Sequence, residues 1–464
     1  MKKTLCCIIT VAMLVSQCFC THAEEPEKFT CGEYRYVLWE DGTAEIVGYD
    51  GCTEELEIPA ELDGYKVVRI GKYAFSLAWW LVGVKIPDGV TDIEELAFAE
   101  CGNLTSITIP DSVTGIYAKT FESCEKLTAL KLSPDHPVLA VIDGVLFDRT
   151  EQKLIWYSQA KKESSYEIPQ GIQKIGDYAF SSCGSLTSIT IPDSVTVLGE
   201  CAFERCENLT GVTIPDSVTE IGAYAFSGCR ALIGLTIPSR VSVIGDGAFV
   251  GCENLTTVLI PDGVTRIGDA LFSRCSRLNG VTIPAGVTSI GDWAFYQCGS
   301  LVSVTIPDSV TSIGEEAFFC CDSLKRLRIP DSVKWIGDRA FARCGSLTEI
   351  AIPASIGDRA FAGCGSLTSV SIGDRATAIG DEAFTNCYGL KTVIIPDSVT
   401  RIGEYAFSLC TELTSVEIPL SVTEIGKEAF VGCEKLTLSV PRLSYAEQYC
   451  EKNSLRFTYS DVLE

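Results

Sequence analysis

The 464-residue chain has almost no histidine. It contains two histidines, and we expect one of them, His22, to be removed with an N-terminal segment. The other, His136, stands in a loop without a nucleophile or metal-binding motif around it. Glycine-rich phosphate loops are absent, and carboxylate pairs are copied from repeat to repeat, so none stands out as catalytic. We therefore expect no enzyme, no metal site and no cofactor.

Basic residues are scarce beside acidic ones. Lys and Arg number 37 against 61 Asp and Glu, and the net charge at pH 7 is −24. A surface this acidic argues against a nucleic-acid partner, because such partners need basic patches. A solvated acidic surface explains the excess more simply than a dedicated cation site does.

Long apolar runs are also missing. The run Leu5–Val15 follows Lys2 and Lys3 and precedes Thr21-His22-Ala23, so we interpret residues 1–23 as a signal peptide. The run is shorter than the roughly 20 residues that a membrane helix needs. The sequence thus predicts a secreted chain without a transmembrane segment.

The chain does contain one sequence motif that is repeated many times. A near-clean copy, Ile-Pro-Asp-Ser-Val-Thr-x-Leu-Gly-x-x-Ala-Phe-x-x-Cys-x-x-Leu-Thr, begins at Ile191. Its phenylalanine recurs fifteen times, at Phe75, Phe98, Phe121, Phe180, Phe203, Phe226, Phe249, Phe272, Phe295, Phe318, Phe341, Phe361, Phe384, Phe407 and Phe430. Twelve of the fourteen intervals are 23 residues. A fixed period of this length predicts a solenoid.

Each copy predicts two short strands and a turn of helix. Ile189 and Ile191 are two apart with Thr190 between them, which is typical of a strand with one buried face. Pro192 ends this strand, and residues 195–198 indicate a second one. Glu200–Cys206 then suits one packed helical turn. Stacked at about 4.8 Å per rung, such units predict an α/β solenoid with parallel strands near 187–191, 210–214 and 233–237.

The motif resembles a known family. Leu-x-x-Ile-x-Ile with a Cys three residues upstream looks like a leucine-rich repeat. The blocks Ile-Pro-Asp-Ser-Val-Thr and Ile-Gly-x-x-Ala-Phe-x-x-Cys are similar to the BspA-like bacterial surface proteins over about residues 33–459. The resemblance implies a secreted or surface-attached bacterial protein with a role in adhesion to host proteins or to other cells.

Fourteen of the 23 cysteines follow a repeat phenylalanine by three residues. Secreted proteins usually oxidise such thiols. Here, however, one cysteine per rung lies on the apolar face, and leucine-rich repeats place Asn or Cys there to fill the interior. We therefore expect buried, reduced thiols. Ligands in a line do not converge on a tetrahedron, which argues against a metal.

The pattern changes at both ends and once inside. Residues 24–58 predict an N-terminal β-hairpin cap, with Tyr34–Leu38 and Ala44–Val47 flanking Asp41-Gly42. Cys31 and Cys52 flank that hairpin, which leaves a bridge or two thiols as alternatives. The solenoid spans 59–440, with a hairpin insert at about 133–167 that separates Phe121 from Phe180 by 59 residues. Residues 441–464, helical from 443 to 453, predict a C-terminal cap.

Two stretches are candidate binding sites. Trp79 and Trp80 occupy positions that elsewhere hold mostly small or polar residues, and they are either an interaction patch or packing against the N-terminal hairpin. Residues 324–375 form a basic segment in an acidic chain, beside a three-residue deletion between Phe341 and Phe361. Its candidates are Arg326, Arg328, Lys334, Trp335 and Arg339. The alternative is that these residues pair with acidic neighbours on adjacent rungs.

Two functions remain after the exclusions. In the first, the array is a protein-binding or adhesion surface for a protein or glycan on host or neighbouring cells. In the second, it is a structural spacer or a self-associating surface component without a specific ligand. A binder is expected to carry rung-specific departures that cluster in space, whereas a spacer is expected to be uniform.

Overall fold

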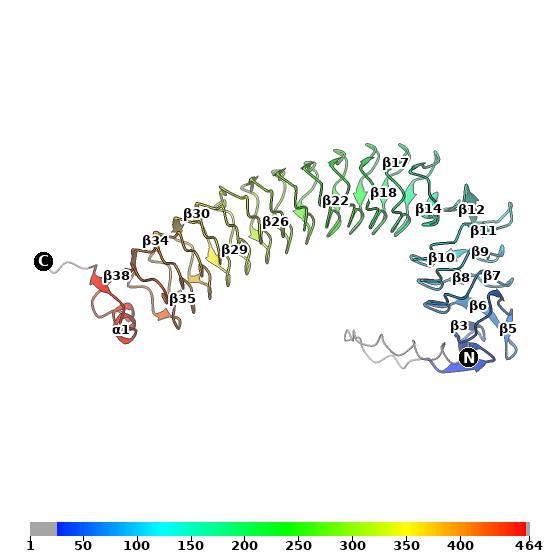
Figure 1. The fold of residues 1–464 in the computed structure, drawn as a ribbon, viewed down its shortest axis with the longest axis horizontal. Helices are drawn as coiled ribbons and strands as arrows, with labels where there is room; N and C mark the ends of the chain where they lie inside the picture. Colours follow the sequence, from blue (N-terminus) through cyan, green and yellow to red (C-terminus); the bar gives the residue numbers. More distant parts are fainter. Residues whose placement is uncertain (1–25, 461–464) are drawn as a thin grey trace.

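The computed structural model describes residues 26–460, and the signal peptide expected at 1–23 lies outside the described residues. The chain coils into an arc of stacked rungs (Figure 1). Each regular rung has three sides: a strand of a first sheet, a strand of a second sheet, and a loop that carries the repeat phenylalanine. In Figure 1 first-sheet strands such as β30 and β34 lie toward the outer edge of the arc, and second-sheet strands such as β29 and β35 lie nearer its inner edge.

The first sheet is built from strands that, in the regular rungs, begin two residues after the repeat leucine, as β17 begins after Leu186. It comprises β4 (Glu55–Glu57), β7 (Gly83–Lys85), β9 (Ser106–Thr108), β11 (Ala129–Lys131), β15 (Ser165–Glu167), β17 (Ser188–Thr190), β19 (Gly211–Thr213), β21 (Gly234–Thr236), β23 (Thr257–Leu259), β25 (Gly280–Thr282), β27 (Ser303–Thr305), β30 (Glu349–Ile352), β32 (Ser369–Ile372), β34 (Thr392–Ile394), β36 (Ser415–Glu417), β38 (Thr437–Val440) and β39 (Phe457–Tyr459). Neighbours pair in parallel, as in β17 with β19. The strands expected near 187–191, 210–214 and 233–237 are confirmed.

The second sheet stacks strands that are mostly two residues long and in most rungs precede a Gly. It comprises β6 (Tyr65–Ile70), β8 (Asp92–Ile93), β10 (Gly115–Ile116), β14 (Lys153–Trp156), β16 (Lys174–Ile175), β18 (Val197–Leu198), β20 (Glu220–Ile221), β22 (Val243–Ile244), β24 (Arg266–Ile267), β26 (Ser289–Ile290), β28 (Ser312–Ile313), β29 (Trp335–Ile336), β31 (Ser355–Ile356), β33 (Ala378–Ile379), β35 (Arg401–Ile402) and β37 (Glu424–Ile425). The strand pairing is not continuous in either sheet: for example, it breaks between β19 and β21 in the first sheet and between β22 and β24 in the second.

The helical turn expected at Glu200–Cys206 is wrong, and with it the α/β label. On the loop side the residues two before and two after every one of the fifteen phenylalanines have positive φ. Around Phe203 these residues are Cys201 (φ 51°) and Arg205 (φ 55°). L-residues in this region cannot continue a right-handed helix. Among the described residues the one α-helix is α1 (Tyr445–Lys452), within the stretch where a helix was expected.

The left-handed residues turn backbone groups toward the next rung. The N–H groups of Cys201, Phe203 and Arg205 donate to carbonyls of the following rung at 2.8, 2.7 and 2.7 Å. A helix would have satisfied these groups within the rung instead. The loop side is therefore a third ladder of hydrogen bonds between rungs, and the array is a β-solenoid with little helix.

The core is a column of stacked aromatic rings. Consecutive repeat phenylalanines have centroids 5.0 to 6.2 Å apart. At the insert the column continues through Trp156, which packs on Phe121, and Tyr157, which packs on Phe180. A cysteine beside each Phe except Phe75, which is followed by Ala78, completes the column. Every cysteine that the structure describes is a free thiol, including Cys31 and Cys52. Thirteen of the fourteen ladder cysteines are buried, as expected, and Cys433 is partly buried.

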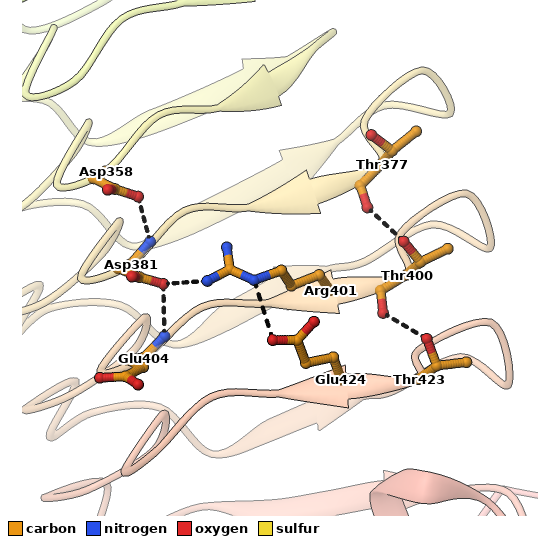
Figure 2. A network of polar contacts seen from close by, with 8 residues as sticks. All are labelled: Asp358, Thr377, Asp381, Thr400, Arg401, Glu404, Thr423 and Glu424. Carbon is orange, nitrogen blue, oxygen red and sulfur yellow. Dashed lines mark hydrogen bonds and ion pairs between the residues drawn. The ribbon is translucent and has the colours of Figure 1, made fainter.

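Polar side chains also repeat from rung to rung (Figure 2). Asp381 Oδ1 accepts the N–H of Glu404 at 2.9 Å and the guanidinium of Arg401 at 2.7 Å. Arg401 also pairs with Glu424 at 3.4 Å. At the other end of these strands Thr400 donates to the backbone carbonyl of Thr377 at 3.2 Å (Figure 2). Asp381 thus satisfies a backbone N–H at a turn, whereas the Thr400 hydroxyl adds a second hydrogen bond to a carbonyl that already accepts the N–H of Thr400.

Both expected hairpins are present. β1 (Lys28–Cys31), β2 (Tyr34–Leu38) and β3 (Ala44–Tyr49) form an antiparallel meander, and β3 then pairs in parallel with β6. β5 (Glu61–Leu62) adds an antiparallel edge to β6. In the insert, β12 (Leu139–Ile142), β13 (Val145–Asp148) and β14 repeat this arrangement, and β14 pairs in parallel with β16. The capping role of the first hairpin stays a prediction.

The insert divides the molecule into two arms. One core cluster runs from Tyr36 to Leu146, and a second runs from Ala140 to Cys450. The arc changes direction sharply where the insert lies (Figure 1).

The three-residue deletion after Phe341 is absorbed in the turn between β30 and β31, and both sheets continue through it. The irregularity falls one rung earlier, where Arg326 makes an isolated bridge to Ser303 and the first sheet is interrupted.

Candidate binding surface

The basic segment does not form one patch. Arg326 and Arg328 occupy outward positions of the first sheet, aligned with Ser303 and Thr305 of the rung before. Lys334 and Trp335 lie on the second sheet, where Trp335 begins β29 and is 52% exposed. Arg339 lies on the loop side, two residues before Phe341, with φ 52°. The five candidates are therefore distributed around the three sides of one rung.

Acidic neighbours on adjacent rungs hold some of these cations. Arg328 pairs with Asp308 at 2.9 Å, and Arg339 pairs with Glu316 at 2.9 Å. The Arg328 pair is exposed on both sides, so it contributes little to stability. Arg326 and Lys334 make no ion pair with any residue in 26–460. The pairing expected as the alternative thus accounts for only part of the segment.

Trp79 and Trp80 separate into two environments. Trp80 packs against the first core cluster, whereas Trp79 is 62% exposed. Their rings meet edge to face at 5.8 Å between centroids. The pair lies between β6 and β7, on the opposite arm of the arc from β29 (Figure 1). It therefore cannot join the basic segment in one site.

A group of aromatic and basic side chains lies together on the loop side. Tyr296 and Phe319 each follow a core phenylalanine by one residue, and their rings stack at 5.2 Å with 9° between planes. The guanidinium of Arg343 lies 5.7 Å from the centre of the Phe319 ring. Trp293, exposed and in the left-handed region, and Arg339 complete what we call the loop-side cluster: Trp293, Tyr296, Phe319, Arg339 and Arg343.

The backbone fixes this cluster. The N–H of Trp293 donates to Glu315 of the next rung at 2.8 Å, and the N–H of Arg343 donates to Ala362 at 2.7 Å. Cys320 lies beside Arg343, and burial raises the pKa of its thiol while the guanidinium partly opposes this. The thiol is thus protonated at neutral pH. The groups that this surface offers to a ligand are therefore the Arg343 guanidinium, the faces of the aromatic rings and the Trp293 indole.

Sequence reasoning found Arg339 and missed the aromatic members. The signal was present, because Tyr296 and Phe319 stand 23 residues apart at a position that holds Ser, Ala, Thr, Glu or Val in every other copy. The consensus motif marks that position as variable, and both residues lie outside the basic segment 324–375.

His136 serves the fold. It is buried, its Nδ1 accepts the N–H of Leu139 at 3.0 Å, and its Nε2 lies 3.1 Å from the carbonyl oxygen of Pro110. Both ring nitrogens are therefore engaged: Nδ1 holds the backbone within the insert, and Nε2 contacts the preceding part of the solenoid. Within residues 26–460 there is no cluster of three or more metal-ligating side chains. The same residues include no helix long and apolar enough to span a membrane.

Comparisons with known proteins agree with this architecture. A family model described as BspA type Leucine rich repeat region (6 copies) matches residues 50–158, 151–279, 265–356 and 354–455. A leucine-rich repeat protein from Bacteroides ovatus is 27% identical, over 93% of this chain and 100% of that one, with a TM-score of 0.53. A leucine rich cell surface protein from Faecalibacterium prausnitzii is 25% identical, over 95% and 96% of the two chains, with a TM-score of 0.36. No curated protein matches.

Proposed function

The chain belongs to the BspA-type leucine-rich repeat family, and from this premise we propose that it is a surface or secreted bacterial protein that binds a partner protein or glycan through the loop-side cluster. Family and fold are those of repeat proteins that are generally non-enzymatic. Binding is therefore the function class that this architecture best supports. The signal peptide expected at residues 1–23 supports export.

One observation carries the proposal. Over three consecutive rungs, those of Phe295, Phe318 and Phe341, the loop side bears Trp293, a stacked ring pair and two arginines. Trp, Tyr and Arg are the residues that most often anchor interfaces. Tyr296 and Phe319 stand at a position that holds Ser, Ala, Thr, Glu or Val in every other copy, and a uniform spacer gives no reason for two stacked rings there. The departure therefore favours a binding surface over the uniform spacer.

The chemistry of the cluster indicates its ligand. Arg343 is exposed and lies beside the Phe319 ring, so an anionic group can meet the guanidinium while apolar or sugar rings stack on Tyr296 and Phe319. Arg339 is already held by Glu316 and is mainly a support. Residues 324–375 carry eight Lys or Arg against five Asp or Glu, so this part of the acidic chain does not repel anions. An acidic protein or glycan fits best.

The experiment is a binding assay of the purified chain against host matrix proteins and whole cells. The test variant combines Tyr296→Ser, Phe319→Ser and Arg343→Ser, which restores residues that the array uses elsewhere and leaves the core intact. The matched control is Arg274→Ser, at the position of Arg343 three rungs earlier. We expect the triple variant to lose at least about tenfold in affinity and the control to bind like the wild type. Unchanged binding by the triple variant would rule out this surface.

A further inference from the structure

The first-sheet face from Arg328 to Glu417 has matching charges at equal distances on either side of β32. Arg328 is two rungs before β32, and Glu417 is two rungs after it. Glu349 lies on the rung immediately before β32, and Lys391 lies on the rung immediately after it. We propose that this face binds a second copy of the same chain, with a twofold axis along β32.

The strand register sets which residues would meet. Ser371 pairs with Ala351 on one side and with Ile394 on the other, so these three share one position along the strand. Arg328 and Glu417 occupy that same position, four residues after Leu324 and Leu413 of their rungs. A twofold axis parallel to the strands reverses the order of the rungs and preserves the position along each strand.

The outermost contacts across that axis are complementary in charge. Arg328 of one copy faces Glu417 of the other, and the contact occurs twice because the interface is isologous. Ala351 faces Ile394, and Ser371 faces itself at the axis. Glu349 faces Thr392 with Lys391 one residue away, which supplies a second ion pair. Any other choice of central rung loses the match of Arg328 with Glu417.

Contacts within one copy leave these groups available. Glu349, Lys391 and Glu417 make no ion pair with any residue between 26 and 460. Arg328 pairs only with Asp308, and the side chains of that pair are 71% and 76% exposed. Ile394 is 63% exposed at a position where Ser and Thr are the commonest residues. An exposed apolar side chain on the rung next to the axis gains by being covered.

The shape of the molecule allows two copies to approach each other through the first sheet, and it limits the affinity of the dimer. The first sheet lies on the outer side of the arc, so two copies can meet there while their arms curve away from each other (Figure 1). Five rungs at about 4.8 Å give a contact about 20 Å long. That is smaller than a standard interface, so we expect a weak dimer that forms at high local concentration. The loop-side cluster lies on another side and remains open in both copies.

Analytical ultracentrifugation over a wide concentration range tests the proposal with charge reversals at exposed positions. Arg328→Glu alone and Glu417→Arg alone each place like charges together twice, and we expect each to weaken self-association at least about tenfold. An equimolar mixture of the two variants is expected to recover wild-type association, because both contacts are then of opposite charge. The double variant Arg328→Glu with Glu417→Arg is expected to recover it in a single chain.

The matched control is Arg266→Glu and Glu424→Arg, which makes the same charge changes on the second sheet. We expect these variants to associate like the wild type, alone and mixed. A monomeric wild type at every concentration overturns the proposal. So does equal association by all variants, and a mixture that fails to recover excludes the twofold arrangement along β32.

Discussion

The thiol of Cys252 donates a hydrogen bond to the backbone carbonyl of Phe226 at 3.2 Å, one rung earlier in the array. The same bond recurs along the ladder, so each cysteine fills the interior and also links two rungs. Serine has a shorter reach and a more polar hydroxyl in a fully buried site. We expect Cys252→Ser to lower the free energy of unfolding by about 1–3 kcal/mol. Urea denaturation measures this, and a variant as stable as the wild type would contradict it.

The buried thiols also predict a loss of stability in alkaline solution. Burial raises the pKa of Cys252 from 9.0 to about 12. The unfolded chain loses this proton near pH 9 while the folded chain keeps it. The contribution to stability is therefore complete below pH 9 and is lost as the pH rises through about 12, at up to about 1.4 kcal/mol per pH unit for each thiol. Urea midpoints between pH 8 and pH 11 measure the slope.

The control for this slope removes two of the titrating groups. Cys252→Ala with Cys275→Ala is expected to show a shallower fall between pH 9 and pH 11, because burial also raises the pKa of Cys275 well above its usual value. Tyrosines titrate in the same range but are unchanged between the two proteins. An identical slope in both would mean that the ladder thiols do not set the alkaline limit.

The strands and the loop side differ in how far the sequence predicts them. Alternation at Ile189 and Ile191 and the stop at Pro192 recur in most copies, so the repeat reinforces the strand signal. The loop side gave a false signal of helix, because Phe203 and Cys206 have helical spacing. Glycine is the usual sequence signal for a left-handed position, yet only five of the thirty left-handed positions beside the repeat phenylalanines are glycine. The backbone is held there by hydrogen bonds to the next rung, which the local sequence does not reveal.

The candidate site was predictable only in part for a related reason. Arg326, Trp335 and Arg339 are close in sequence, but one 23-residue turn passes through three sides of the solenoid and separates them. Tyr296 and Phe319 are far apart in sequence and stack because their rungs are adjacent. In a solenoid, residues one period apart are neighbours. A search for departures along columns would have found this pair.

The left-handed positions predict opposite effects for two exchanges between alanine and glycine. Ala270 has φ 52°, so Ala270→Gly is expected to raise the free energy of unfolding by about 0.5–1 kcal/mol. Gly251 has φ 70°, and a methyl group there would meet nothing nearer than 3.8 Å. Gly251→Ala is therefore expected to cost about 1 kcal/mol through backbone strain alone.

Thermal or urea unfolding measures both exchanges. Ala294→Gly is the matched control, because Ala294 lies between a left-handed residue and Phe295 but does not itself have positive φ. Glycine there is expected to destabilise the chain. A stabilisation by Ala294→Gly as large as that by Ala270→Gly would show that the sign of φ does not decide the outcome.

The insert predicts that the second arm folds without the first. Tyr49 packs on Phe75 at 5.5 Å, and Tyr157 packs on Phe180 at 5.1 Å in the same way. Tyr49 ends β3 and Tyr157 directly follows β14, and each of these strands is the last of a meander and the first of a parallel sheet. The insert thus repeats the N-terminal start of the solenoid, and the larger core cluster begins within it.

A fragment of residues 133–460 is therefore expected to unfold cooperatively in urea and to keep its β-sheet circular dichroism. Residues 26–132 alone are expected to be less stable, because the last rung of this arm, with Phe121 and Leu127, loses the cover that Trp156 and the insert provide. Trp156→Ala in the whole chain is the companion variant, since it removes the ring that packs on Phe121. A fragment 133–460 that aggregates or lacks a cooperative transition, while 26–132 folds, would contradict the assignment of the insert as a second start.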